Sequence, residues 1–460
     1  MARILFGANP ASGHVRPGLP VARELVARGH EVVWYASPRF RSSVERTGAR
    51  LAPFWRGLDF DEADLDTSFP GRVGRSTIRQ LQYDIRAMFI DTIPAHLKDL
   101  RALADESPMN LVVMESSFLA GAFLAEERRL PWAVYGITPL TMRSVDCAPM
   151  GFGLLPRDDL LGRLRHRALN WLVERVVFAA AQRRFQQVRA QVGLPRSEPF
   201  FLDHTSALAP VYLQGTIPEF EYPRRDLPAN VHFVGALLPE APGGSPLPPW
   251  WDELRASRPV VLVTQGTVKI DPALLLEPSI DAMADDDILL IGTTGGAAPE
   301  QILQRRTARN VRLETFIPFA DLLPHVDVVV TNGGYGGTQQ ALAHGIPVVA
   351  AGVTEGKNEV AARLEWSGAG INLRTEKPAP AQIRTAVHTL LNDPSYRLRA
   401  RELQKSYATR DAAASAADLI EGLLSSTSPS TPRQRAPRST SKGNQSRSAP
   451  GADADADAAP

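Results

Sequence analysis

The residues best suited to chemistry in this chain form a glycine-rich turn between a strand and a helix. Val328–Thr331 is a β-branched run of the length of a buried parallel strand, and the turn after it contains Gly333, Gly334, Gly336 and Gly337. The next segment, Thr338–His344, is expected to be a helix whose free N–H groups point at the turn. Such groups attract phosphate, and each contact is worth about 0.3 to 1 kcal/mol. The pattern indicates an anion site, and a tight connection without a ligand is the alternative.

A histidine near the start of the chain offers a second reactive group. His14 lies after an expected strand, Arg3–Ala8, and ahead of an expected helix, Pro17–Arg28. Imidazole has a pKa near 6.5, so it is mostly neutral at pH 7 and can accept a proton from a hydroxyl. From the loop alone, a capping or packing role for His14 is the safer interpretation.

Alternating strand and helix patterns surround both features. The alternation predicts an α/β protein with two doubly wound parallel sheets. Ligands of such sheets bind beyond the carboxyl ends of the strands, so the loops at those ends should border one crevice. The further expected strands are Glu31–Ala36, Leu111–Met114, Trp132–Gly136, Val260–Thr264, Ile288–Gly292, Val311–Thr315 and Ile346–Ala350.

The length of 460 residues predicts two domains. A stretch rich in proline and glycine, Pro239–Pro259, indicates a linker between them. We expect a first domain at residues 1–238, a linker at 239–259 and a second domain at 260–424, whose last helix could pack back on the first domain. The remaining residues, 425–460, are expected to be a disordered tail.

The charge balance excludes a global field that would attract nucleic acid or an anionic membrane, since 51 Lys and Arg nearly cancel 50 Asp and Glu. The single cysteine, Cys147, agrees with a reducing compartment. No apolar run approaches the roughly 20 residues that span a bilayer, and no leader pattern precedes the first strand. These features predict a cytoplasmic protein without a transmembrane segment.

An arginine-rich helical segment, Asp158–Val192, carries an apolar stripe. We expect the stripe to be core or the wall of a pocket; contact with a membrane surface is a less favoured alternative. Its residues are Leu160, Leu161, Leu164, Leu169, Leu172, Val173, Val176 and Val177.

With the glycine turn, the loop Gly13–Pro17 and the linker taken together, the chain resembles the family 1 glycosyltransferases of GT-B fold, and most closely the bacterial macrolide-type group. The resemblance implies two facing Rossmann-like domains, with the acceptor on the first and the donor on the second. It also implies transfer with inversion of a sugar from a UDP- or dTDP-linked donor to a hydroxyl of an apolar acceptor, such as a natural product or a lipid-like molecule. No cofactor beyond the nucleotide sugar is implied.

The resemblance assigns catalytic roles to two residues. His14 matches the family's base, and Glu115 matches the acid that supports it, where the family commonly has Asp. A carboxylate at the far ring nitrogen would fix the tautomer and stabilise the imidazolium. A solvated acid at a strand end is the alternative for Glu115. Phe118 and Trp132 are the candidate acceptor contacts.

The resemblance also assigns a donor site. Phe316 would stack on the base and the backbone of Ile317 would bind its edge, while Gln340 would bind the ribose. The alternative for Phe316 is a core aromatic, as for Phe319. The other expected donor contacts are Gly13, Thr267, Asn332, Gly334, Gly336, Gly337, Thr338, Glu355 and Lys357.

Several of these positions depart from the family pattern. Asn332 stands where a phosphate-binding His is usual, Gly337 replaces Ser or Thr, and Gly356 and Lys357 replace an Asp-Gln pair that grips the sugar. Lys357 could restore the lost positive charge or contact an acidic sugar, or it could be a surface lysine. The departures predict altered donor handling. They also keep open two other functions, a degenerate GT-B nucleotide-binding or auxiliary protein and a sugar-nucleotide epimerase.

The acidic loop Leu58–Asp66 contains two Asp-x-Asp patterns, Asp59–Asp61 and Asp64–Asp66. This pattern binds Mg²⁺ or Mn²⁺ in another glycosyltransferase fold. Backbone amides and a helix N-terminus can neutralise the leaving diphosphate instead, so no metal site is expected.

Overall fold

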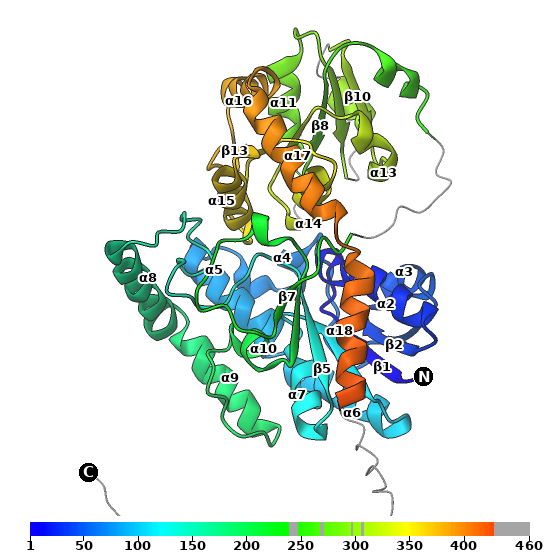
Figure 1. The fold of residues 1–460 in the computed structure, drawn as a ribbon, viewed down its shortest axis with the longest axis vertical. Helices are drawn as coiled ribbons and strands as arrows, with labels where there is room; N and C mark the ends of the chain where they lie inside the picture. The colour runs from blue at the N-terminus through cyan, green and yellow to red at the C-terminus, as the bar shows by residue number, and fades with distance from the viewer. Residues whose placement is uncertain (239–246, 267–270, 296–297, 305–307, 427–460) are drawn as a thin grey trace, which may run out of the picture. The chain divides into compact units, whose positions relative to one another are not determined.

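The computed structural model describes residues 1–238, 247–266, 271–295, 298–304 and 308–426. Within these ranges the strands form two sheets, and every pairing is parallel (Figure 1). This confirms the predicted fold class.

The first sheet has the strand order β3-β2-β1-β4-β5-β6-β7. The order reverses direction between β1 and β4, which pair in the register Gly7↔Met114. Such a reversal leaves a crevice at the carboxyl ends of the two strands, because the chain leaves them toward opposite sides. The strands are β1 Arg3–Gly7, β2 Glu31–Ala36, β3 Arg50–Pro53, β4 Leu111–Glu115, β5 Trp132–Gly136, β6 Val211–Gln214 and β7 Val231–Phe233.

Helices cover both faces of this sheet, and each face has its own apolar core. One core contains Leu100 and Phe123, and the other contains Val21 and Leu25. The helices are α1 Ser12–Val15, α2 Gly18–Ala27, α3 Arg41–Glu45, α4 Leu65–Ser68, α5 Thr77–Asp84, α6 Ile93–Glu106, α7 Leu119–Arg128, α8 Leu160–Leu172, α9 Ala179–Gln191 and α10 His204–Leu208, with π-helices η3 Ile85–Ile90 and η4 Val173–Val177.

The second sheet has the order β10-β9-β8-β11-β12-β13 and reverses direction between β8 and β11. The run Val260–Thr264 of β8 is buried throughout, as expected of a parallel strand covered on both faces. The strands are β8 Val260–Thr264, β9 Leu289–Thr293, β10 Val311–Glu314, β11 Val328–Thr331, β12 Val348–Ala350 and β13 Gly370–Asn372. The helices are α11 Leu276–Met283, α12 Pro299–Leu303, α13 Phe319–Leu322, α14 Tyr335–Ala343, α15 Lys357–Ser367, α16 Pro380–Asn392 and α17 Pro394–Ala408, with the 3-10 turns η6 Trp251–Arg255 and η7 Leu323–His325.

The last described helix, α18 Ala412–Ser426, lies beside α2 of the first sheet (Figure 1). Ile420 is fully buried in the core of that face. Arg28, next to the end of α2, forms ion pairs with Asp418 at 2.6 Å and with Glu421 at 2.7 Å. The chain therefore returns to the first sheet after completing the second.

The segment Asp158–Val192 is helical, but most of its apolar stripe is exposed. Leu160 and Leu161 are 67% and 68% exposed, and Trp171 is also exposed. The expectation that the stripe is core is wrong for α8, because α8 buries its opposite face, with His166 and Asn170 against residues 144–145. Among the described residues no helix is long and apolar enough to cross a membrane.

Part of the expected linker is built into the fold. Trp250 donates a hydrogen bond from Nε1 to Glu314 at 2.8 Å, and η6 follows it. Residues 239–246, and residues 427–460 of the expected tail, lie outside the described ranges.

Candidate functional site

The reversal point of the first sheet brings His14 and Glu115 together. Glu115 is the last residue of β4, and His14 lies in the one-turn helix α1, four residues beyond the loop that leaves β1 at Ala8–Pro10. His14 Nδ1 lies 3.0 Å from Glu115 Oε1, and the Glu115 side chain is fully buried. The two residues are 101 positions apart in sequence, so the sheet order alone accounts for their contact.

Two further residues hold the Glu115 carboxylate. Asn9 Nδ2 donates to Oε1 at 2.7 Å, and the backbone N–H and Oγ of Ser117 donate at 2.7 Å each. Burial by itself raises the pKa of Glu115, but His14 and these Ser117 donors outweigh it, so the pKa lies below its usual value. Asn9 and Ser117 were not predicted from the sequence, although each is a polar residue two positions after the end of a strand, a signal that could have found them.

The environment of His14 suits a proton acceptor. Burial lowers the pKa of the imidazole, but Glu115 and then Glu62 raise it more, so the pKa lies above 6.5. No described residue forms a hydrogen bond with Nε2, and the side chain is 21% exposed. With Nδ1 occupied by Glu115, Nε2 is the nitrogen that can take a proton from a ligand.

Other residues fix the His14 helix in place. Glu62 accepts from the backbone N–H of Ser12 at 3.0 Å, and Tyr135 Oη donates to the His14 carbonyl at 3.0 Å. The Phe89 ring stacks on the imidazole with centroids 6.2 Å apart and planes at 18°. Phe89 belongs to the π-helix η3, a rare element that often occurs at functional sites. Gly13 is exposed, and no atom lies within 4 Å of the position of an added Cβ.

The side chains of Phe118 and Trp132 are buried in the core. Phe118 is 2% exposed and packs on Tyr35 and His96 in the core. Trp132 is the first residue of β5, whereas Tyr135 is the residue of that strand that pairs with Glu115. Trp132 is therefore about 10 Å from the site end of the sheet, at roughly 3.3 Å per residue. Both side chains are buried in the core of the first sheet, and acceptor contact by either stays a prediction.

The reversal point of the second sheet carries the glycine turn. The helix α14 begins at Tyr335, three residues earlier than expected, so Gly336 and Gly337 lie in its first turn. Neither would bring an added Cβ within 4 Å of another atom, which leaves open space beside the helix N-terminus. Gly333 has a φ of +81°, a conformation that favours glycine. Open space thus lies beside the first turn of α14, whose N–H groups have no acceptor within the helix, as an anion site requires.

Asn332 joins the loops that follow β8 and β11. Its Nδ2 donates to the carbonyl of Gln265, and its Oδ1 accepts from the N–H of Gly334 at 3.3 Å. The backbone N–H of Gly334 is therefore already used within the protein and is not free for a ligand. Thr267, expected beside this turn, lies outside the described residues.

Thr338 and Gln340 differ in accessibility. Thr338 is fully buried, and its Oγ1 has no hydrogen-bond partner among the described residues. The expected contact of Thr338 with a ligand stays a prediction. Gln340 is half-buried.

The loop after β10 separates its two aromatic residues. Phe316 is 61% exposed, whereas Phe319 packs against the core. Ile317 is buried. An exposed ring beside a fixed backbone segment is the arrangement that a stacking base requires, and the core alternative does not apply to Phe316.

Lys357 is not a surface lysine. Its side chain is 16% exposed, and Nζ lies 2.7 Å from Glu355 Oε2. Glu355 has a φ of +55°, a conformation that costs a residue other than glycine about 1 to 3 kcal/mol. Such strain is concentrated at ligand sites. The charge of Lys357 is shared with Glu355, so the pair adds little net positive charge.

The acidic loop has structural partners. Asp59 accepts from Ser37, Asp61 pairs with Arg39, and Asp64 caps α4 at Thr67. Among the described residues no group of three or more His, Cys, Asp or Glu is placed to hold a metal ion.

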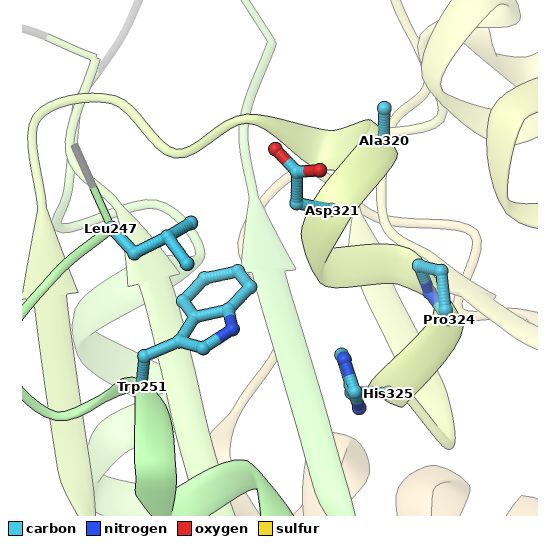
Figure 2. A pocket seen from close by; sticks show the side chains of 6 residues that line it. All are labelled: Leu247, Trp251, Ala320, Asp321, Pro324 and His325. Carbon is cyan, nitrogen blue, oxygen red and sulfur yellow. The ribbon is translucent and has the colours of Figure 1, made fainter. Parts of the chain in front are cut away.

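A separate hollow of about 470 Å³ lies near the second sheet (Figure 2). Trp251 approaches it from one side, and Asp321 and His325 approach it from α13 and η7 on the other. None of its lining residues belongs to the site described above, so the expected donor contacts do not form this hollow.

Residues 283–423 match the family described as erythromycin biosynthesis protein CIII-like, C-terminal domain. The chain is 44% identical over 423 residues to the 4'-demethylrebeccamycin synthase of Lentzea aerocolonigenes. The matched region covers 92% of this chain and 100% of that protein. The chain is also 34% identical over 438 residues to UDP-glycosyltransferase 2 of Phaeomoniella chlamydospora, over 91% of this chain and 95% of that protein. Among solved structures, a calicheamicin glycosyltransferase is similar with a TM-score of 0.71 at 22% identity, over 93% of this chain and 100% of that one.

Proposed function

The chain belongs to the family 1 glycosyltransferases of GT-B fold that act on bacterial natural products, and on this premise we propose how it transfers a sugar. The donor is a nucleoside-diphosphate sugar, the acceptor is a hydroxyl of an apolar natural product, and the anomeric configuration is inverted. The single observation that carries the proposal is the 3.0 Å contact of His14 Nδ1 with the buried Glu115 carboxylate.

In this mechanism the acceptor hydroxyl gives its proton to His14 Nε2. The oxygen attacks the anomeric carbon while the bond from that carbon to the diphosphate oxygen breaks, and the diphosphate leaves with the electron pair. The attack comes from the face opposite the leaving group, so the configuration inverts. Glu115 stabilises the imidazolium that forms, because its carboxylate is fixed at Nδ1.

The glycine turn and the N-terminus of α14 stabilise the leaving diphosphate. The open space beside Gly336 and Gly337 in the first turn of this helix supports this role. Preorganised donors of this kind usually supply the largest share of a rate enhancement. Since they neutralise the charge that develops, the reaction needs no metal ion.

The names of relatives support the substrate classes. One relative at 34% identity is named a UDP-glycosyltransferase, and the relative at 44% identity is named for a rebeccamycin product. We infer that the donor is UDP- or dTDP-linked, with Phe316 stacked on the base, and that the acceptor is a natural product with a large apolar surface.

The test is incubation of the purified protein with UDP- and dTDP-sugars, each with and without a panel of apolar alcohols. Release of nucleoside diphosphate with formation of a β-glycoside from an α-linked donor supports the proposal. Interconversion of sugar nucleotides without an acceptor would indicate an epimerase instead. Nucleotide binding with no product from any pair would indicate a protein without catalysis.

A further inference from the structure

The first turn of α15 binds residues 150–153, a segment of the connection between β5 and α8. Glu359 Oε1 accepts from the N–H of Gly151 at 2.9 Å and from the N–H of Gly153 at 2.7 Å. Asn358 Nδ2 donates to the Gly151 carbonyl at 2.7 Å. Three hydrogen bonds therefore fix this short segment to α15.

Glu359 is itself held by a buried chain of charges. Arg363 Nη1 donates to Glu359 Oε2 at 3.2 Å, and Arg363 Nε donates to Glu221 Oε1 at 2.8 Å. Arg363 and Glu221 are both 2% exposed. Burial raises the pKa of Glu221, but Arg363 and then Arg224 outweigh it, and the pKa is lowered. Arg363 is thus paired with both carboxylates, and loss of one partner would leave a buried group unpaired.

Met150, the residue before Gly151, lies close to Gly356, one of the two positions where the family has its sugar-binding pair. Gly356 has a φ of +79°, and an added Cβ there would lie 2.7 Å from Met150 Cε. In the same turn, the Lys357 carbonyl oxygen would lie 3.3 Å from an added Cβ at Gly333. The first turn of α15 is therefore close to both the glycine turn and Met150.

We propose that Glu359 is a positioning residue that builds the sugar end of the donor site, and that Met150, which it holds in place, forms the outer wall of that end. The inference rests on the proposed function, in which the glycine turn holds the diphosphate. A diphosphate at that turn directs the sugar past Gly356 and Lys357, toward Met150. The hydrogen bonds from Gly151 and Gly153 to Glu359 then affect binding of the sugar and leave binding of the nucleotide unaffected.

The first test is Glu359→Gln, with affinities measured by calorimetry for UDP-glucose, dTDP-glucose, UDP and dTDP. The amide oxygen can still accept from Gly151 and Gly153, but the amide nitrogen faces the Arg363 guanidinium, so the wall is displaced. We expect Kd for the sugar nucleotide that the wild type prefers to rise about tenfold, because one hydrogen bond to a charged group is lost. Kd for the matching nucleoside diphosphate without the sugar should change less than about twofold. Equal weakening of both ligands, or of neither, would overturn the proposal.

The matched control is Glu365→Gln on the same helix. Glu365 pairs with Arg374 at 2.8 Å on the surface, so its loss should leave both affinities unchanged. A weakened sugar nucleotide in this control would mean that the effect comes from α15 as a whole, and the proposal would fail.

The second variant, Met150→Ala, shortens the wall without disturbing the charged chain. We expect the ratio of kcat/KM between the preferred sugar nucleotide and donors with other hexoses to narrow. An unchanged ratio, with wild-type transfer intact, would overturn the inference and leave the proposed function standing. Absence of transfer by the wild-type protein from every donor would overturn both.

Discussion

At the scale of single residues, Glu115 sets the orientation and the basicity of His14. The carboxylate lies on Nδ1, is held by Asn9 and Ser117, and raises the pKa of the imidazole. A raised pKa makes His14 a stronger base, but it also means that more of the enzyme is protonated, and inactive, at mildly acidic pH.

The pH dependence of transfer follows from that shift. Because protonated His14 cannot accept a proton, kcat/KM should fall on the acid side with an apparent pKa above 6.5. Glu115→Gln removes the charge that raises this pKa. The acid limb of the profile should therefore move to lower pH, while the plateau falls by about a hundredfold or more because the imidazolium loses its support.

The profile is measured from pH 5 to pH 9 with saturating acceptor. An acid limb that stays in place in Glu115→Gln would mean that another group titrates. Glu62→Gln is the matched comparison, since Glu62 makes the smaller contribution to the pKa of His14 and should move the limb in the same direction by less.

Lys357 gives a second test at this scale. Lys357→Ala removes a cation next to the glycine turn and leaves Glu355 unpaired there, so UDP and dTDP should bind several-fold more weakly. Lys377→Ala, an exposed lysine, is the control and should change nothing. Unchanged affinity in Lys357→Ala would show that the pair with Glu355 does not contact the nucleotide.

The sequence could name His14 and Glu115 but could not name their neighbours. Resemblance to a family assigned the two roles. The contacts of Asn9 and Glu62 join residues 50 or more positions apart in the sequence. Phe89 belongs to a π-helix, which no residue pattern predicted. Phe118 and Trp132 are buried, as aromatic residues near a strand commonly are, and their contact with an acceptor stays a prediction.

At the scale of elements, α8 and η4 present an apolar surface that the apolar pattern alone could not assign. An apolar stripe predicts burial only when another element covers it, and the pattern does not report which face is covered. In η4, Val173 is buried and Val176 is 57% exposed, although the two lie in the same turn.

These two valines give a matched stability test. Val173→Ala should destabilise the protein by about 1 to 3 kcal/mol because it empties core volume. Val176→Ala should change the free energy of unfolding by less than about 0.5 kcal/mol, or raise it slightly, since Ala is the better helix former. Urea unfolding monitored by circular dichroism compares them. A large loss in Val176→Ala would mean that another surface covers this face.

At the scale of the whole molecule, the last described helix, α18, packs on the first sheet. Ile420 is fully buried there, and Arg28 binds Asp418 and Glu421. Ile420→Ala should cost about 2 to 5 kcal/mol. Gly422→Ala, on the same helix with no atom within 4 Å of the new Cβ, should stabilise by about 0.5 to 1 kcal/mol. Similar midpoints of urea unfolding for both variants would show that α18 does not hold the first sheet.

The pattern of strands and helices predicted both sheets, but not their full width. Central strands such as β8 and β11 are continuous apolar runs and were found within one or two residues. The unpredicted strands β3, β7 and β13 lie at sheet edges, whereas β6, also unpredicted, lies between β5 and β7. An edge strand has one neighbour and is short, so its sequence carries little signal; β7 and β13 have three residues each.

The central claim, that His14 is the base for sugar transfer, is tested most directly by kcat of His14→Ala with affinity for UDP and dTDP measured on the same preparation. We expect kcat to fall by about two to four orders of magnitude, the usual contribution of a general base, with nucleotide Kd within about twofold of the wild type. Turnover close to that of the wild type, with nucleotide binding intact, would contradict the account.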